Sequence, residues 1–201
     1  MRKLIVQAFV TLDGVMQAPG GPDEDDSGGF AHGGWSVNYS DEQVGQFAAE
    51  ATAKPFAMVL GRKTYDIMAA FWPHAPEDAG AKTFNEATKY VASRTRPTLE
   101  WSNSVLIEGD VADAVAALKK EDGPELQVYG SANLVQTLLR HTLVDQFRLL
   151  VYPVVIGSGK RLFGEGTIPA GLRLLDSKTS TTGVVMSTYE PAGEIVTASV
   201  H

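Results

Sequence analysis

Four consecutive residues, Gly61, Arg62, Lys63 and Thr64, form a group whose types and spacing suit ligand binding. Glycine closes an apolar run, and two cations and a hydroxyl then open a helical pattern. The N-terminus of a helix offers free N–H groups and a positive dipole end, which together favour a phosphate. Basic residues at this position oppose the dipole unless an anion is present. A phosphate site is therefore one interpretation, and a basic pair at a helix start without a ligand is the other.

A second group, Ser93, Arg94, Thr95 and Arg96, directly follows the apolar run 90–92. In α/β sheets, ligands bind beyond the carboxyl ends of the strands. Two arginines and two hydroxyls at such a position suit a second phosphate, for example a ribose 2′-phosphate. A solvated basic loop is the alternative interpretation.

A third junction, Gly130, Ser131, Ala132 and Asn133, lies between the apolar run 126–129 and a helical pattern. Glycine and small side chains let the backbone approach a diphosphate closely. A single glycine before a serine that can cap a helix is also an ordinary junction. The order of the three junctions along the chain is therefore more informative than any one of them.

Further candidates for catalysis and substrate binding lie on loops. Asp13 follows the first apolar run, and we expect it to protonate a substrate, although aspartate before glycine is also common turn chemistry. Lys160 and Arg161 lie among glycines, where they could bind a phosphorylated substrate, decorate a hairpin or meet a partner subunit. The aromatic candidates for a planar-ring pocket, which are equally candidates for the core, are Trp35, Phe71 and Trp72.

Alternating strands and helices must position these residues. Apolar and β-branched runs predict strands over residues 2–12, 57–60, 90–92, 104–107, 126–129 and 146–156. Helical periodicity with Pro or Gly stops predicts helices over residues 40–54, 63–71, 110–121 and 132–140. Ser40 with Gln43 fits a capping box for the first helix. With a closing hairpin over 172–181 and 184–189, we expect one α/β domain, residues 1–201, with a largely parallel sheet and an antiparallel edge.

Glycine is concentrated in two loops. Seven of the 20 glycines lie between Gly14 and Gly34, and five lie between Gly157 and Gly171. Loops longer than about 12–15 residues in compact domains are usually functional or disordered. We expect the segment 13–40 to form part of a substrate site or, alternatively, a solvated excursion.

Composition excludes several classes of function. The 201 residues include 17 Lys and Arg against 24 Asp and Glu, and the net charge of −7 argues against nucleic-acid or anionic-membrane binding. Cysteine is absent, which excludes disulfides, thiolate nucleophiles and cysteine-held metal centres. His32 and His74 have no spaced partner, so we expect no metal site. The interrupted apolar N-terminus and the lack of a long apolar run predict a cytoplasmic protein.

The order of these motifs resembles that of the dihydrofolate-reductase-like superfamily. The motifs are Thr11-Leu12-Asp13-Gly14, the three junctions and the late loop 153–163. Within the superfamily, the pattern is most similar to the reductase domain at the C-terminus of the bacterial bifunctional riboflavin-biosynthesis deaminase-reductase. The resemblance covers roughly residues 3–190. It implies a three-layer αβα fold with a mixed, mainly parallel sheet of about eight strands, a bound NADPH and a homodimer.

The resemblance also implies roles by position. Asp13 and the loop through Gly34 and Trp35 would face the nicotinamide and the substrate, with Lys160 and Arg161 as further substrate-binding candidates. The residues implied to hold NADPH are Gly61, Arg62, Lys63, Thr64, Ser93, Arg94, Thr95, Gly130, Ser131, Ala132 and Asn133.

The chain departs from the family pattern at several points. Dihydrofolate reductases have paired glycines where this chain has Gly130 and Ser131. They also carry a carboxylate on the first helix, where this chain has Gln43 or Gly45, so dihydrofolate is disfavoured as a substrate. Because cysteine is absent, we expect no zinc deaminase half.

We therefore expect an NADPH-dependent reductase of a small heterocyclic or ribosylaminopyrimidine-type substrate, similar to 5-amino-6-(5-phosphoribosylamino)uracil reductase. One alternative is an NADP(H)-binding module of the same fold without efficient catalysis. Another is a protein-interaction domain with an empty pocket.

Overall fold

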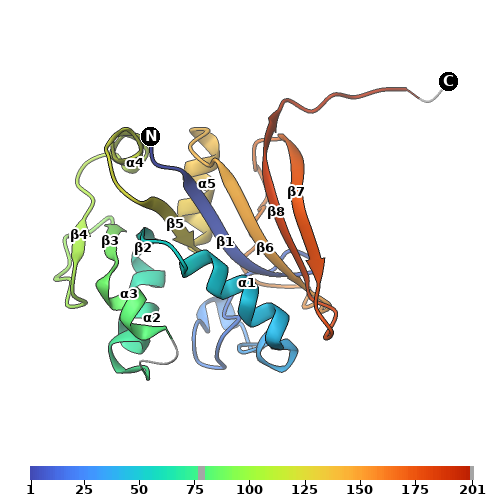
Figure 1. Ribbon diagram of the computed structural model, residues 1–201, viewed down its shortest axis with the longest axis horizontal. Coiled ribbons are helices and arrows are strands. Elements are labelled where there is room, and N and C mark those ends of the chain that lie inside the picture. Colours follow the sequence, from blue (N-terminus) through green and yellow to red (C-terminus); the bar gives the residue numbers. More distant parts are fainter. Residues whose placement is uncertain (77–79, 200–201) are drawn as a thin grey trace.

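An eight-stranded sheet forms the centre of the computed structural model, which describes residues 1–76 and 80–199 (Figure 1). The strands are β1 Leu4–Thr11, β2 Phe56–Gly61, β3 Thr88–Ala92, β4 Ser104–Leu106, β5 Glu125–Tyr129, β6 Gln146–Tyr152, β7 Gly171–Thr179 and β8 Val185–Gly193. They are ordered β4-β3-β2-β5-β1-β6-β8-β7. The pairs from β4 to β6 are parallel, whereas β8 pairs antiparallel with β6 and with β7. The predicted mixed, mainly parallel sheet with a C-terminal antiparallel hairpin is confirmed.

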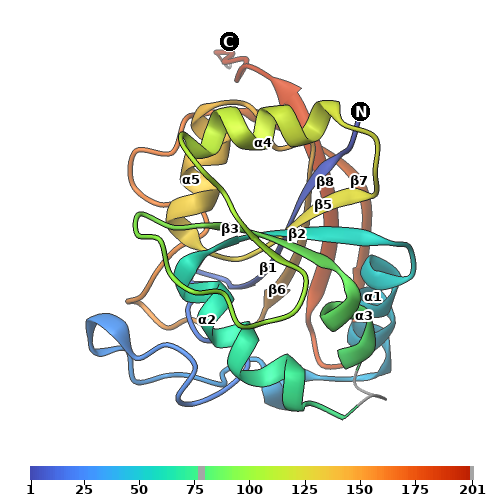
Figure 2. The same cartoon turned by 90° about the vertical axis from the view of Figure 1, so that its left-hand side faces the viewer.

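Helices cover both faces of this sheet, which gives three layers. The helices are α1 Glu42–Thr52, α2 Arg62–Phe71, α3 Ala81–Glu86, α4 Val111–Lys120 and α5 Ala132–Arg140, and single 3-10 turns span Ser27–Gly29, Val37–Tyr39 and Trp72–His74. Helices α4 and α5 pack on one face, and α1, α2 and α3 pack on the other (Figure 2).

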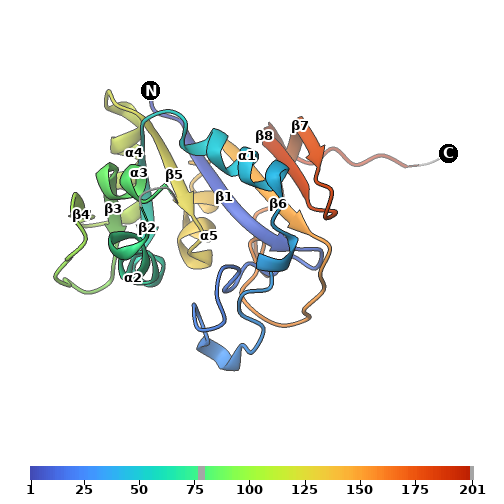
Figure 3. The same cartoon turned by 60° about the horizontal axis from the view of Figure 1, so that its bottom comes forward.

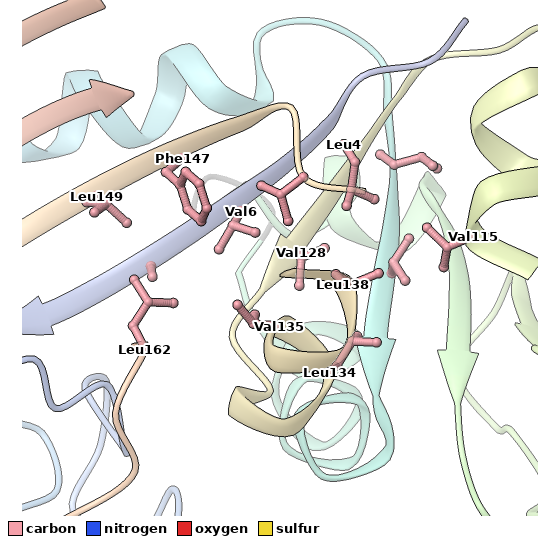
Figure 4. Packing of buried hydrophobic residues seen from close by; sticks show 14 of the residues in the cluster. Leu4, Val6, Val115, Val128, Leu134, Val135, Leu138, Phe147, Leu149 and Leu162 are labelled. Atoms are coloured by element: carbon pink, nitrogen blue, oxygen red, sulfur yellow. The ribbon is translucent and has the colours of Figure 1, made fainter. Parts of the chain in front are cut away.

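The main core lies between the sheet and the helices α4 and α5. Leu4 and Val6 of β1 and Val128 of β5 pack against Leu134 and Leu138 of α5, and all five side chains are at most 6% exposed (Figure 4). Successive strand residues point to opposite faces, so the intervening residues of the same strands face α1 and α2. Because the central strands are buried on both faces, they have near-continuous apolar sequences, which is why the sequence predicts them.

Several predicted boundaries differ from the structure. Helix α1 is capped by Asp41 rather than by Ser40, because the Asp41 carboxylate accepts the Val44 N–H at 2.9 Å. The same carboxylate accepts a hydrogen bond from Thr181 in the β7–β8 turn, a contact that no local pattern reveals. Strand β6 ends at Tyr152, because the following proline has no N–H for the ladder. The six-residue α3 is too short for a periodicity and was not predicted.

The long segment between β1 and α1 packs against the loop that follows β6, and Figure 3 shows both at the same end of the sheet. Met16 N donates to Lys160 O at 2.8 Å, and Leu162 N donates to Gly14 O at 3.1 Å. A small buried cluster contains Val15, Ala18 and Phe30. This segment is therefore built into the fold rather than being a solvated excursion. Within the described part of the chain, no helix is both long and apolar enough to cross a membrane.

Candidate functional site

A cleft of about 1630 Å³ crosses the carboxyl edge of the sheet. In strand order, its walls are the segments after β4, β3, β2 and β5, followed by residues 7–9 of β1 and Leu150 of β6. The cleft forms here because β5 ends at Tyr129, opposite Gln7, whereas β1 and β2 continue beyond that level. Its volume exceeds the roughly 1,000 Å³ of a large single-ligand pocket, so it has room for two ligands together.

The N-termini of α2 and α5 meet in the wall of this cleft, where one side chain joins them. Ser131 Oγ accepts a hydrogen bond from Gly61 N at 3.0 Å and donates one to Thr64 Oγ1 at 2.5 Å. A β-carbon on Gly61 would lie 2.5 Å from this Oγ, so only glycine permits the approach.

Ser131 therefore does not cap α5, although its residue type suggested that it could. Its φ of 64° is left-handed, and within the described residues neither α2 nor α5 has a side-chain cap. The first N–H groups of a helix have no partner inside the helix, so uncapped ends can donate to an anion. The positive dipole ends of both helices add to this effect, so the junction can bind a diphosphate.

Three arginines lie near the cleft in different states. Arg62 Nε donates to both carboxylate oxygens of Asp66, at 2.7 and 2.8 Å, and its terminal nitrogens make no hydrogen bond within the described residues. Arg94 is exposed and has no ion pair in the described part of the chain. Arg96 pairs with Glu108 at 3.6 Å. All three line the cleft, so each presents a guanidinium group that can contact a phosphate, and Arg62 and Arg94 are the two predicted for the cofactor.

The structure brings together all the residues predicted for the cofactor and only part of the substrate group. The eleven residues from Gly61–Thr64, Ser93–Thr95 and Gly130–Asn133 all line the cleft, and so does Lys160. Asp13, Gly34, Trp35 and Arg161 lie outside the lining.

Asp13 holds a loop instead of facing the cleft. Its carboxylate accepts hydrogen bonds from Thr11 Oγ1 at 2.5 Å, Gly157 N at 2.8 Å and Ile156 N at 3.2 Å. The hydrogen bond from Thr11, with help from the two backbone N–H groups, lowers the pKa of Asp13 to about 2. The contacts give Asp13 a structural role in this loop, outside the cleft lining, and its role as proton donor stays a prediction.

Trp35 and Arg161 also have structural roles. Trp35 Nε1 donates to Gln17 O at 2.7 Å, and its ring packs edge-on against Tyr152 with centroids 5.3 Å apart. Arg161 Nη2 donates to Gly157 O at 3.0 Å. These contacts support the core interpretation of Trp35 over the ring-pocket interpretation, and they place Arg161 with the loop that Asp13 holds.

A network centred on Asp25 joins the two predicted ligand lysines. Asp25 Oδ1 lies 2.5 Å from Lys63 Nζ, and its Oδ2 lies 2.5 Å from Lys160 Nζ. Burial would raise the pKa of Asp25, but the hydrogen bonds from both lysines outweigh it and hold this pKa well below its usual range. Gln17 Nε2 donates to Asp25 O at 3.0 Å, which fixes the backbone. The network ties α2 to both long loops over the cleft.

Glu24 is a cleft residue that the sequence reasoning missed. Its Oε2 accepts hydrogen bonds from Gly20 N at 2.6 Å and Gly21 N at 3.2 Å. Burial raises the pKa of Glu24, and the nearby Asp25 charge raises it further, against the lowering by the two hydrogen bonds. In the sequence this residue is hidden in the acidic run 23–26, which is typical of a solvated loop.

The cleft and sheet order have counterparts in known proteins. A sequence model of the RibD C-terminal domain matches residues 2–186. The chain belongs to the RibD C-terminal domain family. The Bacillus subtilis protein YyaP, itself uncharacterised, is 28% identical over 192 residues, which cover 94% of each chain.

Solved structures support the same fold. A putative riboflavin biosynthesis protein from Shewanella sp. PV-4 superposes with a TM-score of 0.65 at 19% identity, over 94% of this chain and 98% of that one. A dihydrofolate reductase from Enterococcus faecalis, complexed with NADP(H) and RAB-propyl, superposes with a TM-score of 0.61 at 15% identity, over 94% of this chain and 96% of that one. The predicted dihydrofolate-reductase-like fold is thereby confirmed for this RibD C-terminal domain.

Proposed function

We propose that this RibD C-terminal domain is an NADPH-dependent reductase of a small heterocyclic or ribosylaminopyrimidine-type substrate, similar to 5-amino-6-(5-phosphoribosylamino)uracil reductase. The observation that carries the proposal is the pair of uncapped helix N-termini joined by Ser131 at the edge of a cleft with room for two ligands. Family membership supports a reductase of this fold.

The residues fit NADPH by their chemistry. Gly61 and Ser131 bring the N-termini of α2 and α5 together. Because neither helix has a side-chain cap within the described residues, the first N–H groups of both can donate to the diphosphate. Arg62 and Arg94 would bind the 2′-phosphate, since guanidinium groups match phosphate oxygens in pairs. When bound, NADPH supplies the hydride, and the protein supplies position and electrostatics.

We assign the protonation of the substrate to Glu24 instead of Asp13. Glu24 lines the cleft, and its raised pKa lets it keep a proton nearer to neutral pH than an ordinary glutamate does. The Glu24→Gln variant should lose the part of the pH–rate profile that reports this group, while Asp13→Asn should keep it.

The deciding experiment measures binding and turnover separately. NADPH should raise the melting temperature and quench tryptophan fluorescence. The near-ultraviolet absorbance of NADPH should then fall when an aminopyrimidine ribosyl phosphate is added. Binding without turnover of this or related rings would favour the NADP(H)-binding module, and the ionised, loop-bound Asp13 is the observation that keeps this alternative in view. No binding at millimolar NADPH would refute both.

We also propose that the protein is a homodimer paired through β7. This strand forms one edge of the sheet, and its Leu172, Leu174 and Leu175 are 40%, 51% and 45% exposed. An unpaired edge with exposed leucines is a surface that a second strand can cover.

A further inference from the structure

The inner end of the cleft is walled by β1, β5 and β6 and covered by α1, which lies across β1 in Figure 3. None of the described residues that these four elements contribute to the lining is acidic. A β-carbon on Gly45 of α1 would meet no atom within 4 Å, so the helix leaves open space in the cleft at this point. A ring-sized ligand can therefore lie beside α1 at this end of the cleft.

Polar side chains form a row across the sheet beneath α1. In the strand register, Gln7 of β1 lies opposite Tyr129 of β5 and opposite Arg148 of β6. Arg148 Nη2 donates to Phe47 O of α1 at 2.8 Å, which places the row on the face that α1 covers. Gln7 is only 9% exposed, yet it lines the cleft.

Two N–H groups in this row have no partner among the described residues. Gln7 Nε2 and Arg148 Nε are buried and make no hydrogen bond with the described residues. Buried donors in proteins are almost always paired. A half-turn of the Gln7 carboxamide would exchange its oxygen and its NH₂ group. The oxygen would then accept from the neighbouring Arg148, and the NH₂ group would face the cleft. Because Nε2 is buried away from the cleft before this half-turn, Gln7 donates to a ligand in the turned orientation.

The inner end of the cleft also carries positive charge, which favours the same ligands as the unpaired N–H donors do. Arg148 lies 3.6 Å from Glu50, but Glu50 is 53% exposed and also pairs with Lys178 at 3.5 Å. Water and a second cation therefore weaken the compensation that Glu50 gives to Arg148. The inner end favours a ligand that brings acceptors and no positive charge.

We propose that Gln7 selects the substrate ring by donating a hydrogen bond from Nε2 to an acceptor atom on its edge. The ligand class is a neutral or anionic heterocycle with a carbonyl oxygen at that edge. A ring that presents amino groups or a protonated nitrogen there would add donors and charge to a site that already has both in excess. This inference rests on the proposed function, because it treats the cleft as the substrate site of a reductase.

Two pteridines test the inference, because they share the same fused ring system and differ in the groups at one edge. Lumazine presents carbonyl groups at positions 2 and 4, and 2,4-diaminopteridine presents amino groups there. Calorimetric titration into NADP⁺-saturated protein should give lumazine about tenfold tighter binding or more. The Gln7→Leu variant should lose about tenfold in lumazine affinity. The isosteric Gln7→Glu variant should reverse the preference, because it replaces a donor by an acceptor.

Controls separate this inference from the proposed function. NADP⁺ affinity should be the same in wild type and both variants, since Gln7 is not among the residues that we assign to the cofactor. Equal affinity for the two pteridines, no binding of either at millimolar concentration, or an unchanged ratio in Gln7→Glu would overturn the role of Gln7. If NADP⁺ itself does not bind, the proposed function fails, and the two pteridines still test Gln7 in the unliganded protein.

Discussion

Replacing Gly61 by alanine perturbs the junction of α2 and α5 without changing backbone preference. The φ of Gly61 is −72°, which alanine adopts readily, so the only change is the added β-carbon. This carbon would lie 2.5 Å from Ser131 Oγ and 2.8 Å from Ser131 Cβ. An ordinary contact begins at 3.4 Å, so Ser131 must retreat by about 0.9 Å.

The retreat breaks the two hydrogen bonds of Ser131, which are 3.0 Å to Gly61 N and 2.5 Å to Thr64 Oγ1. Each such bond contributes about 1 kcal/mol, and overpacking costs about 1–3 kcal/mol. We expect the free energy of unfolding to fall by about 3–5 kcal/mol. The N-terminus of α5 moves with Ser131, and the loss of one charge-assisted hydrogen bond to the diphosphate should weaken NADPH binding by about 10–100-fold.

Gly45→Ala is the matched control. It adds the same methyl group to α1, where it meets no atom within 4 Å. It should raise the free energy of unfolding by about 0.5–1 kcal/mol, because alanine is the better helix former, and leave NADPH affinity unchanged. Urea unfolding followed by tryptophan fluorescence and calorimetric NADPH titration measure the two effects. Wild-type NADPH affinity in Gly61→Ala, at reduced stability, would refute the role of this close approach in cofactor binding.

Other substitutions test the remaining assignments. Arg62→Ala should weaken NADPH by about 10–100-fold and NADH much less, and an equal loss for both in parallel titrations would exclude a contact with the 2′-phosphate. Asp13→Asn should lower stability at neutral pH. The wild-type advantage should be complete above the ordinary pKa of 3.8 and shrink as pH falls toward about 2, because the folded-state pKa is the lower one. Urea titrations over this range would show a constant gap if Asp13 did not titrate in this way. Leu174→Arg should convert the proposed dimer to a monomer, as measured by light scattering, and a wild-type monomer would exclude pairing through β7.

Local chemistry explains which parts of the site the sequence predicts. A glycine that ends a strand, followed by small, basic or hydroxyl residues that begin a helix, is encoded within about four neighbouring residues. The junctions at Gly61, Ser93 and Gly130 are of this kind, and all three line the cleft. The buried central strands are equally local, since burial on both faces requires an apolar run.

The roles of single polar side chains depended on partners far away in the chain. Asp13 has the same sequence context whether it protonates a ligand or holds a loop, and only the fold reveals its contact with Ile156, 143 positions away. Lys63 could pair with a phosphate or with a carboxylate, and in the structure it forms an ion pair with Asp25. Gln7 is an unremarkable polar residue in a strand until the register sets it beside Arg148.

The sequence by itself therefore determined the order of the elements and the junctions that line the cleft. Periodicity, capping and glycine act over a few residues, so they can be read along the chain. Only the tertiary structure decided which charged and polar groups remain available at that place. Hydrogen bonds and ion pairs act over a few ångströms, whatever the separation of the two residues in the sequence. The partner of a polar or charged side chain is therefore known only when the fold has brought the two together.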